Sequence, residues 1–124
     1  MGLAKILVID DEPVICRSIC SALVIDEHEA LSATDGEVGL QMCHEHRPDV
    51  VITDIMMPGK TGLDVIRELR ETRQNIGIIA ITGLIHSTLS ELKQLGVDEV
   101  FRKPLRLRQL MSTVNRLLEQ NGVS

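Results

Sequence analysis

Residues 50–59 read VVITDIMMPG, an apolar run that ends in an acid, two methionines and a turn. The run Val50–Ile52 is rich in β-branched residues and predicts a strand buried on both faces, as strands of parallel sheets are. Pro58-Gly59 predicts a turn soon after it. Asp54 therefore stands where a buried strand meets its loop. Because burying an unpaired carboxylate is costly, we expect a cation or a chemical role to accompany it.

Four other segments have the composition of strands, and helical patterns separate them. The strand-like segments are Ile6–Ile9, a weaker one at Ala30–Ala33, Ile78–Ile81 and Val97–Phe101. Apolar residues recur at helical spacing within residues 15–23, 38–43, 63–69, 89–95 and 107–118. Five alternations of strand and helix predict an α/β fold, a parallel sheet with helices on both faces, in one domain spanning residues 1–124.

Local signals mark several helix ends. Pro13 suits the first turn of a helix, and Thr34-Asp35-Gly36-Glu37 matches a capping box. Gly96 and Gly122 suit helix C-termini. These signals agree with the division into five strand–helix pairs.

Composition and charge restrict the class of protein. The chain has 124 residues, 44% of them apolar, and a net charge of −5, which argues against a general binder of nucleic acids or membrane surfaces. The apolar run near the N-terminus is too short for a signal peptide. The three cysteines match no disulfide framework or zinc ligand set, so we expect buried thiols in a reducing compartment. A cytoplasmic protein is the expectation.

Polar residues follow four of the predicted strands. They are Asp10-Asp11-Glu12, Asp54, Thr82-Gly83 and Lys103. The carboxyl ends of parallel strands lie at one edge of a sheet, and two carboxylates about 5 Å apart repel by roughly 3 kcal/mol at an effective dielectric near 20. Oxygen ligands without a Cys/His set favour Mg²⁺. Asp54 could then act as a nucleophile and form an aspartyl phosphate, with Lys103 and Thr82 contacting the phosphoryl oxygens.

Each of these residues also has a purely structural interpretation. Asp11 or Glu12 could cap the helix that Pro13 begins, Thr82 could be a turn residue, and Lys103 could be an ordinary solvated lysine. The functional interpretation is favoured because paired acids, a single acid, a hydroxyl and a lysine occupy four strand ends in one order.

Four stretches together resemble the receiver domain of two-component response regulators. They are ILVIDDEP (6–13), DIMMPG (54–59), ITG (81–83) and FRKP (101–104), and the resemblance extends over nearly the whole chain. It implies a flavodoxin-like fold: a five-stranded doubly wound parallel sheet of order 2-1-3-4-5 with five helices.

The resemblance also implies roles for individual residues. Asp54 resembles the phosphoryl acceptor, and Asp10 and Asp11 resemble the acidic pair of the magnesium site, with Asp11 as the more direct ligand. Met56 would give the ion its backbone carbonyl. Lys103 resembles the lysine that contacts the phosphoryl group, and its bond to Pro104 is often cis in the family.

Two further positions resemble the switch of the family, and two positions depart from its usual pattern. Thr82 resembles the switch hydroxyl and Phe101 the switch aromatic. Gly83 stands where a small alanine is usual, which would loosen the loop that leads to Leu84 and Ile85. Phe101 replaces the more frequent tyrosine, so an output that reads a hydroxyl there is excluded.

The resemblance implies a signalling module rather than an enzyme. A sensor histidine kinase or a histidine phosphotransfer protein would donate the phosphoryl group to Asp54. A downstream protein or effector domain would then bind the face around Phe101 and the last helix. Residues 100–118 carry five basic residues and no acid, so that face could meet an acidic partner; direct binding of nucleic acid or membrane is not expected.

Two other functions fit parts of the pattern. An aspartate-nucleophile phosphatase of the haloacid-dehalogenase type also combines Asp, Mg²⁺, Thr and Lys, but Asp10-Asp11-Glu12-Pro13 lacks its Asp-x-Asp spacing. A receiver-like fold that only binds partners would not need the acids, Thr82 and Lys103 together. Phosphoryl uptake distinguishes these alternatives.

Overall fold

The computed structural model describes residues 4–73, 75–83 and 89–122, which form a five-stranded parallel sheet with helices on both faces. The strands are β1 (Lys5–Ile9), β2 (Glu29–Ala33), β3 (Val50–Asp54), β4 (Gly77–Thr82) and β5 (Glu99–Arg102). Their order is β2-β1-β3-β4-β5, and every neighbouring pair is parallel, as predicted. The order reverses between β1 and β3, where such sheets open a crevice at the strands' carboxyl ends.

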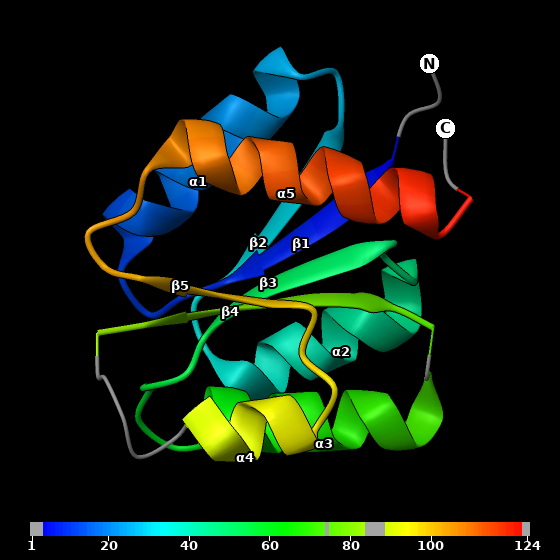
Figure 1. Cartoon of the computed structure of the whole chain (residues 1–124). Helices are drawn as coiled ribbons and strands as arrows, with labels where there is room; N and C mark the ends of the chain where they lie inside the picture. Colours follow the sequence, from blue (N-terminus) through cyan, green and yellow to red (C-terminus); the bar gives the residue numbers. More distant parts are fainter. Residues whose placement is uncertain (1–3, 74, 84–88, 123–124) are drawn as a thin grey trace.

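Five helices complete the two outer layers. They are α1 (Pro13–Ile25), α2 (Gly36–His46), α3 (Gly62–Thr72), α4 (Leu89–Gln94) and α5 (Leu107–Gln120). α1 and α5 cover one face of the sheet, and α2, α3 and α4 cover the other (Figure 1). The predicted α/β fold class is confirmed.

Alternating side chains of the inner strands build a core on each face. Ile6 and Val8 pack with α1 and α5, whereas Leu7 and Ile9 pack with the helices opposite, and all four are fully buried. This division follows from the two-residue period of a strand. β3 is buried along its whole length and lies at the centre of the sheet, so its last residue, Asp54, is held by a fully packed strand.

The helix N-termini confirm one prediction and correct two. Pro13 is in the first turn of α1, as predicted, but the N-cap residue Glu12 makes no side-chain capping bond, so the capping interpretation of Asp11 or Glu12 is wrong. α2 is capped by Asp35 rather than by Thr34, because the carboxylate of Asp35 accepts the backbone N–H of Val38 at 2.8 Å.

β5 begins two residues later than the predicted 97–101. Gly96 has a positive φ of 75° and ends α4, and the N–H of Val97 still donates to the carbonyl of Leu92 at 3.2 Å. Val97 therefore completes the helix terminus instead of starting the strand. Gly122 also has a positive φ, 77°, at the end of α5, as predicted.

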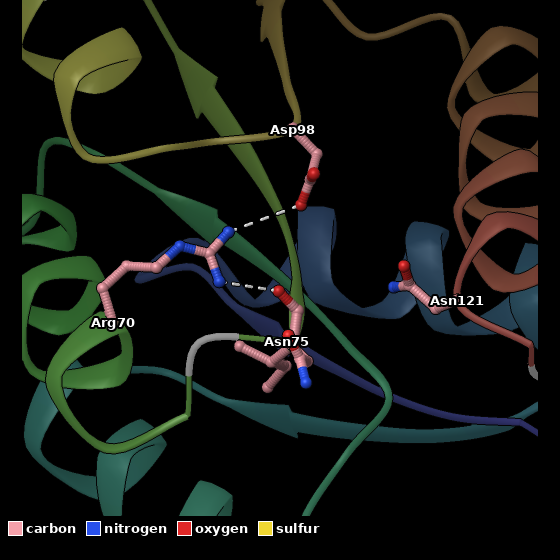
Figure 2. Close-up of a pocket in the computed structure, with 5 residues that line it drawn as sticks. Arg70, Asn75, Asp98 and Asn121 are labelled. Carbon is pink, nitrogen blue, oxygen red and sulfur yellow. Dashed lines mark hydrogen bonds and ion pairs between the residues drawn. The ribbon is translucent and has the colours of Figure 1, made fainter.

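Arg70 ties α3 to the segment between α4 and β5 at the amino-terminal edge of the sheet. Its guanidinium donates to the carbonyls of Ile76 at 2.8 Å and Gly96 at 2.7 Å, and it pairs with the carboxylate of Asp98 at 3.5 Å. Asp98 also accepts the backbone N–H of Ile78 at 2.8 Å. Figure 2 shows Arg70 and Asp98 lining a polar cavity with Asn75 and Asn121. This edge lies away from the acidic strand ends.

The cysteines are free thiols, and two of the three are buried as predicted. Cys16 and Cys43 are buried, and burial raises the pKa of each to about 11, whereas Cys20 is half-buried. Over the described ranges, none of the helices has the length and apolar character needed to span a membrane.

Candidate functional site

Asp10, which follows the last residue of β1, and Asp54, the last residue of β3, lie next to each other. Ile9 and Thr53 are register partners, so the residue that follows each of them reaches the crevice at the same level. Both acids are buried, with 0% and 3% of their surface exposed. The structure therefore brings together the two carboxylates that the sequence places at these strand ends.

Both oxygens of Asp54 have a partner. Its Oδ1 accepts the backbone N–H of Met56 at 3.1 Å, and its Oδ2 accepts the ammonium of Lys103 at 3.0 Å. Met56 is 54% exposed, and the contact that it makes with Asp54 comes from its backbone N–H. These two contacts fix the carboxylate in one orientation at the rim of the sheet.

Asp10 has one well-bonded oxygen and one that lacks a hydrogen bond. Oδ1 accepts the backbone N–H of Glu12 at 2.9 Å. Oδ2 is buried and has no hydrogen-bond partner among the described residues, although Lys103 Nζ lies 3.3 Å away as an ion-pair partner. Burial, helped by the nearby charge of Asp54, raises the pKa of Asp10 above its ordinary value of 3.8.

Lys103 is the cation at the centre of this cluster. Its Nζ donates to Glu12 Oε1 at 2.8 Å and to Asp54 Oδ2 at 3.0 Å, and its side chain is 21% exposed. Burial alone would lower the pKa of Lys103, but its hydrogen bonds to Glu12 and Asp54 outweigh that effect and raise it. Lys103 is therefore a fixed positive charge at neutral pH. Its peptide bond to Pro104 is cis, as the resemblance implies.

The acids outnumber the cation, and their geometry suits a metal ion. One oxygen from each of Asp10, Glu12 and Asp54 lies within 4.8 Å of the others. Asp11 is exposed and lines a cavity next to this cluster. The same cavity is lined by Glu12, Asp54, Met56, Gly83 and Lys103. An excess of carboxylate oxygen, including the buried Asp10 Oδ2 without a hydrogen bond, is the donor set that a hard divalent cation prefers.

Thr82 and Phe101 occupy the neighbouring strands on the β5 side of the site. Thr82 is 2% exposed, and its backbone carbonyl accepts the N–H of Lys103 at 3.0 Å. Phe101 is half-buried, pairs with Ile81 across the sheet and packs against the core under α1 and α5. Gly83 lines the cavity next to the acids. The loop that Gly83 was expected to loosen, leading to Leu84 and Ile85, lies outside the described residues.

The sequence interpretation missed two residues that build the site. A Cβ on Gly62 would lie 2.0 Å from the backbone oxygen of Asp54 and 2.7 Å from Ile55 Cα, so α3 can begin beneath the acid only with glycine there. Thr61 caps α3 in a capping box with Asp64. The Thr61-x-x-Asp64 spacing could have located that helix start.

Glu12 was predicted as one of the acids at the end of the first strand, with helix capping as the alternative, and the structure places it among the site residues. Its carboxylate points away from α1 toward Lys103. The sequence carries no signal for this contact, because the two residues lie 91 positions apart.

Comparison with known proteins agrees with this geometry. Residues 6–115 match the family of response regulator receiver domains. A probable transcriptional regulatory protein, TcrX of Mycobacterium tuberculosis, is 30% identical over 96% of this chain and 51% of its own length. The chain spans about half the length of the curated relatives it matches.

Two solved structures are similar over nearly their full length. A response regulator receiver domain protein from Clostridium thermocellum is 36% identical, with a TM-score of 0.88 over 97% of this chain and 98% of the other. The response regulator TrrA of Thermotoga maritima, solved in complex with Mg(2+)-BeF, is 34% identical, with a TM-score of 0.85 over 94% of this chain and 100% of the other.

Proposed function

This chain belongs to the family of response regulator receiver domains of two-component systems, and from that premise we propose that it accepts a phosphoryl group on Asp54. The donor is a sensor histidine kinase or a histidine phosphotransfer protein, and the reaction requires Mg²⁺. The phosphorylated chain then changes the face that it offers to a partner in the cytoplasm. The family assignment does not support the phosphatase alternative.

Asp54 is the acceptor because both oxygens of its carboxylate are held in place by neighbouring donors. In the transfer, a carboxylate oxygen of Asp54 forms a bond to phosphorus while the bond from phosphorus to the donor's histidine nitrogen breaks, and the imidazole leaves. The N–H of Met56 and the ammonium of Lys103 orient the carboxylate. Lys103 offsets the negative charge that the phosphoryl oxygens bring.

The residues present fit a magnesium ion. Asp10, Asp11, Asp54 and the backbone carbonyl of Met56 would hold it, and the excess of carboxylates over cations in the cluster supports this assignment. When bound, the ion neutralises charge on the attacking carboxylate and on the phosphoryl oxygens. The similarity to TrrA, which was solved with Mg(2+)-BeF, also supports the choice of metal.

Thr82 and Phe101 would carry the change away from Asp54. The Thr82 hydroxyl moves toward the new phosphoryl group, and the Phe101 ring follows into the space beneath it. The altered surface around Phe101 and α5 then recruits a downstream protein or an effector domain. Arg102, Arg106 and Arg108 are exposed along this part of the chain and favour an acidic partner, and the proposal involves no direct contact with nucleic acid or membrane.

The observation that carries the proposal is the contact of Lys103 with Asp54 beside a second buried acid. The test is incubation with a small acyl-phosphate donor and Mg²⁺, followed by intact mass measurement. We expect a gain of one phosphoryl mass that disappears in excess chelator and in Asp54→Asn. Full labelling with chelator present, or in the variant, would refute the assignment, and no labelling of wild type would favour a receiver fold that only binds partners.

A further inference from the structure

Glu12 has a fixed backbone and a carboxylate that the helix does not use. Its N–H donates to Asp10 Oδ1 at 2.9 Å, and its carbonyl accepts the N–H groups of Ile15 at 3.1 Å and Cys16 at 3.2 Å. Its side chain makes no capping bond and is 59% exposed. The carboxylate instead accepts the ammonium of Lys103 at 2.8 Å, the shortest of the three contacts of that ammonium with acids.

Hydrogen bonds to Glu12 and Asp54 take two of the three N–H donors of Lys103, and Asp10 is an ion-pair neighbour of the same ammonium. An ammonium has three N–H groups, and here three carboxylates lie around it, with Nζ–O distances of 2.8 Å to Glu12, 3.0 Å to Asp54 and 3.3 Å to Asp10. A phosphoryl oxygen that pairs closely with Lys103 therefore competes with these acids for the ammonium.

Glu12 is the acid that can give way most easily. Its side chain is 59% exposed, whereas those of Asp54 and Asp10 are 5% and 0% exposed. Water can replace Lys103 at an exposed carboxylate with little loss, because exposed ion pairs are weak. A buried carboxylate that lost Lys103 would remain without a partner, which costs far more.

We propose that Glu12 holds Lys103 in a resting contact that competes with pairing of the ammonium to an incoming phosphoryl group. This inference rests on the proposed function of Asp54. Glu12 is then a positioning residue that slows phosphoryl uptake by competing for Lys103. It makes no bond to the phosphoryl group.

The test compares initial rates of phosphorylation by a small acyl-phosphate donor, measured by intact mass with Mg²⁺ saturating for each variant. Glu12→Gln should react roughly two- to fivefold faster than wild type, the range expected for losing one partly exposed charge contact. The gain should shrink as salt is raised, because exposed charges are screened. Glu99→Gln is the control, because Glu99 is also a half-exposed carboxylate in an ion pair, with Arg116 at 3.2 Å. It should react like wild type.

A double-mutant cycle separates competition for Lys103 from simple charge repulsion. In a Lys103→Ala background, which is slower overall, the further change Glu12→Gln should bring no gain. An equal gain in both backgrounds, or no gain in Glu12→Gln alone while wild type is labelled, would overturn the inference and leave the proposed function intact. Failure of wild type to take up any phosphoryl group would overturn both.

Discussion

Lys103 Nζ lies 3.0 Å from Oδ2 of Asp54, although 49 positions separate the two residues in the chain. The contact joins the end of β3 to the residue that follows β5, across the carboxyl edge of β4. It places a permanent cation against a carboxylate that is otherwise buried. The same cation also contacts Asp10 and Glu12, so one lysine organises the whole acidic cluster.

Asp10→Asn should stabilise the fold when no Mg²⁺ is present. The folded state raises the pKa of Asp10, so wild type loses stability as pH rises from about 3.8 through that raised value, and the penalty persists at neutral pH. We expect the free energy of unfolding of Asp10→Asn to exceed that of wild type at pH 7. The difference should vanish below the ordinary pKa of aspartate, where both carry a neutral side chain.

Urea unfolding across a pH series measures this effect. Glu119→Gln, an exposed site, should differ from wild type by less than about 0.5 kcal/mol at every pH. Saturating Mg²⁺ should stabilise wild type more than Asp10→Asn, because only wild type keeps the full set of acids. A variant less stable than wild type at pH 7 without Mg²⁺ would contradict the assignment of a burial penalty to Asp10.

Gly62→Ala should destabilise the chain by about 2 kcal/mol or more, since its Cβ would meet backbone atoms of Asp54 and Ile55 that cannot move freely. Gly83→Ala is the matched control, because a Cβ there would have no heavy atom of the described residues within 4 Å. We expect it to change the free energy of unfolding by less than about 0.5 kcal/mol. Equal losses in the two variants would show that the close approach beneath Asp54 is not what requires glycine.

Substitutions of Asp11 and of Lys103 should have different effects on metal binding. Asp11→Ala should weaken Mg²⁺ binding by roughly tenfold or more, as loss of a residue that orients or holds a metal commonly does. Lys103→Ala should leave Mg²⁺ affinity nearly unchanged while reducing phosphorylation, because a cation contributes no metal ligand. Calorimetric titration with Mg²⁺ gives both affinities, and comparable losses in the two variants would argue against separate roles.

Phe101 offers a single-site probe of the switch, because it is the only Phe in a chain without Tyr or Trp. Its half-buried ring should move inward when Thr82 approaches the phosphoryl group, which shifts the population between two ring positions. Fluorinated phenylalanine should therefore report a changed ¹⁹F resonance on phosphorylation. The change should be largely lost in phosphorylated Thr82→Ala. An identical wild-type spectrum with and without the phosphoryl group would mean that the output leaves by another face.

The strands were predictable because buried parallel strands have continuous apolar runs, as Val50–Ile52 shows, whereas their order was implied only by the resemblance to receiver domains. The acids, Thr82 and Lys103 were predictable as a group because parallel strands deliver their carboxyl ends to one edge. Contacts between individual side chains were not predictable from the sequence. The pairing of Glu12 with Lys103 depends on the direction in which the side chain leaves the N-cap position, and the sequence pattern placed Glu12 among the strand-end acids without indicating its partner.

The close approach of backbone segments was also not predictable from the sequence. The need for glycine at position 62 arises from the distance between the start of α3 and the end of β3, which no periodicity encodes. The late start of β5 has a similar origin, since Val97 has a strand-like side chain but its N–H is committed to the end of α4.

The most direct measurement of the central claim is the location of the acyl phosphate. Treatment of the phosphorylated chain with borohydride reduces an aspartyl phosphate to homoserine, and tandem mass spectrometry of the digested chain identifies the converted position. We expect homoserine at position 54 alone, formed only when Mg²⁺ was present during phosphorylation. Conversion at Asp10, Asp11 or Glu12, or a phosphoryl group retained on another residue while Asp54 stays unmodified, would contradict it.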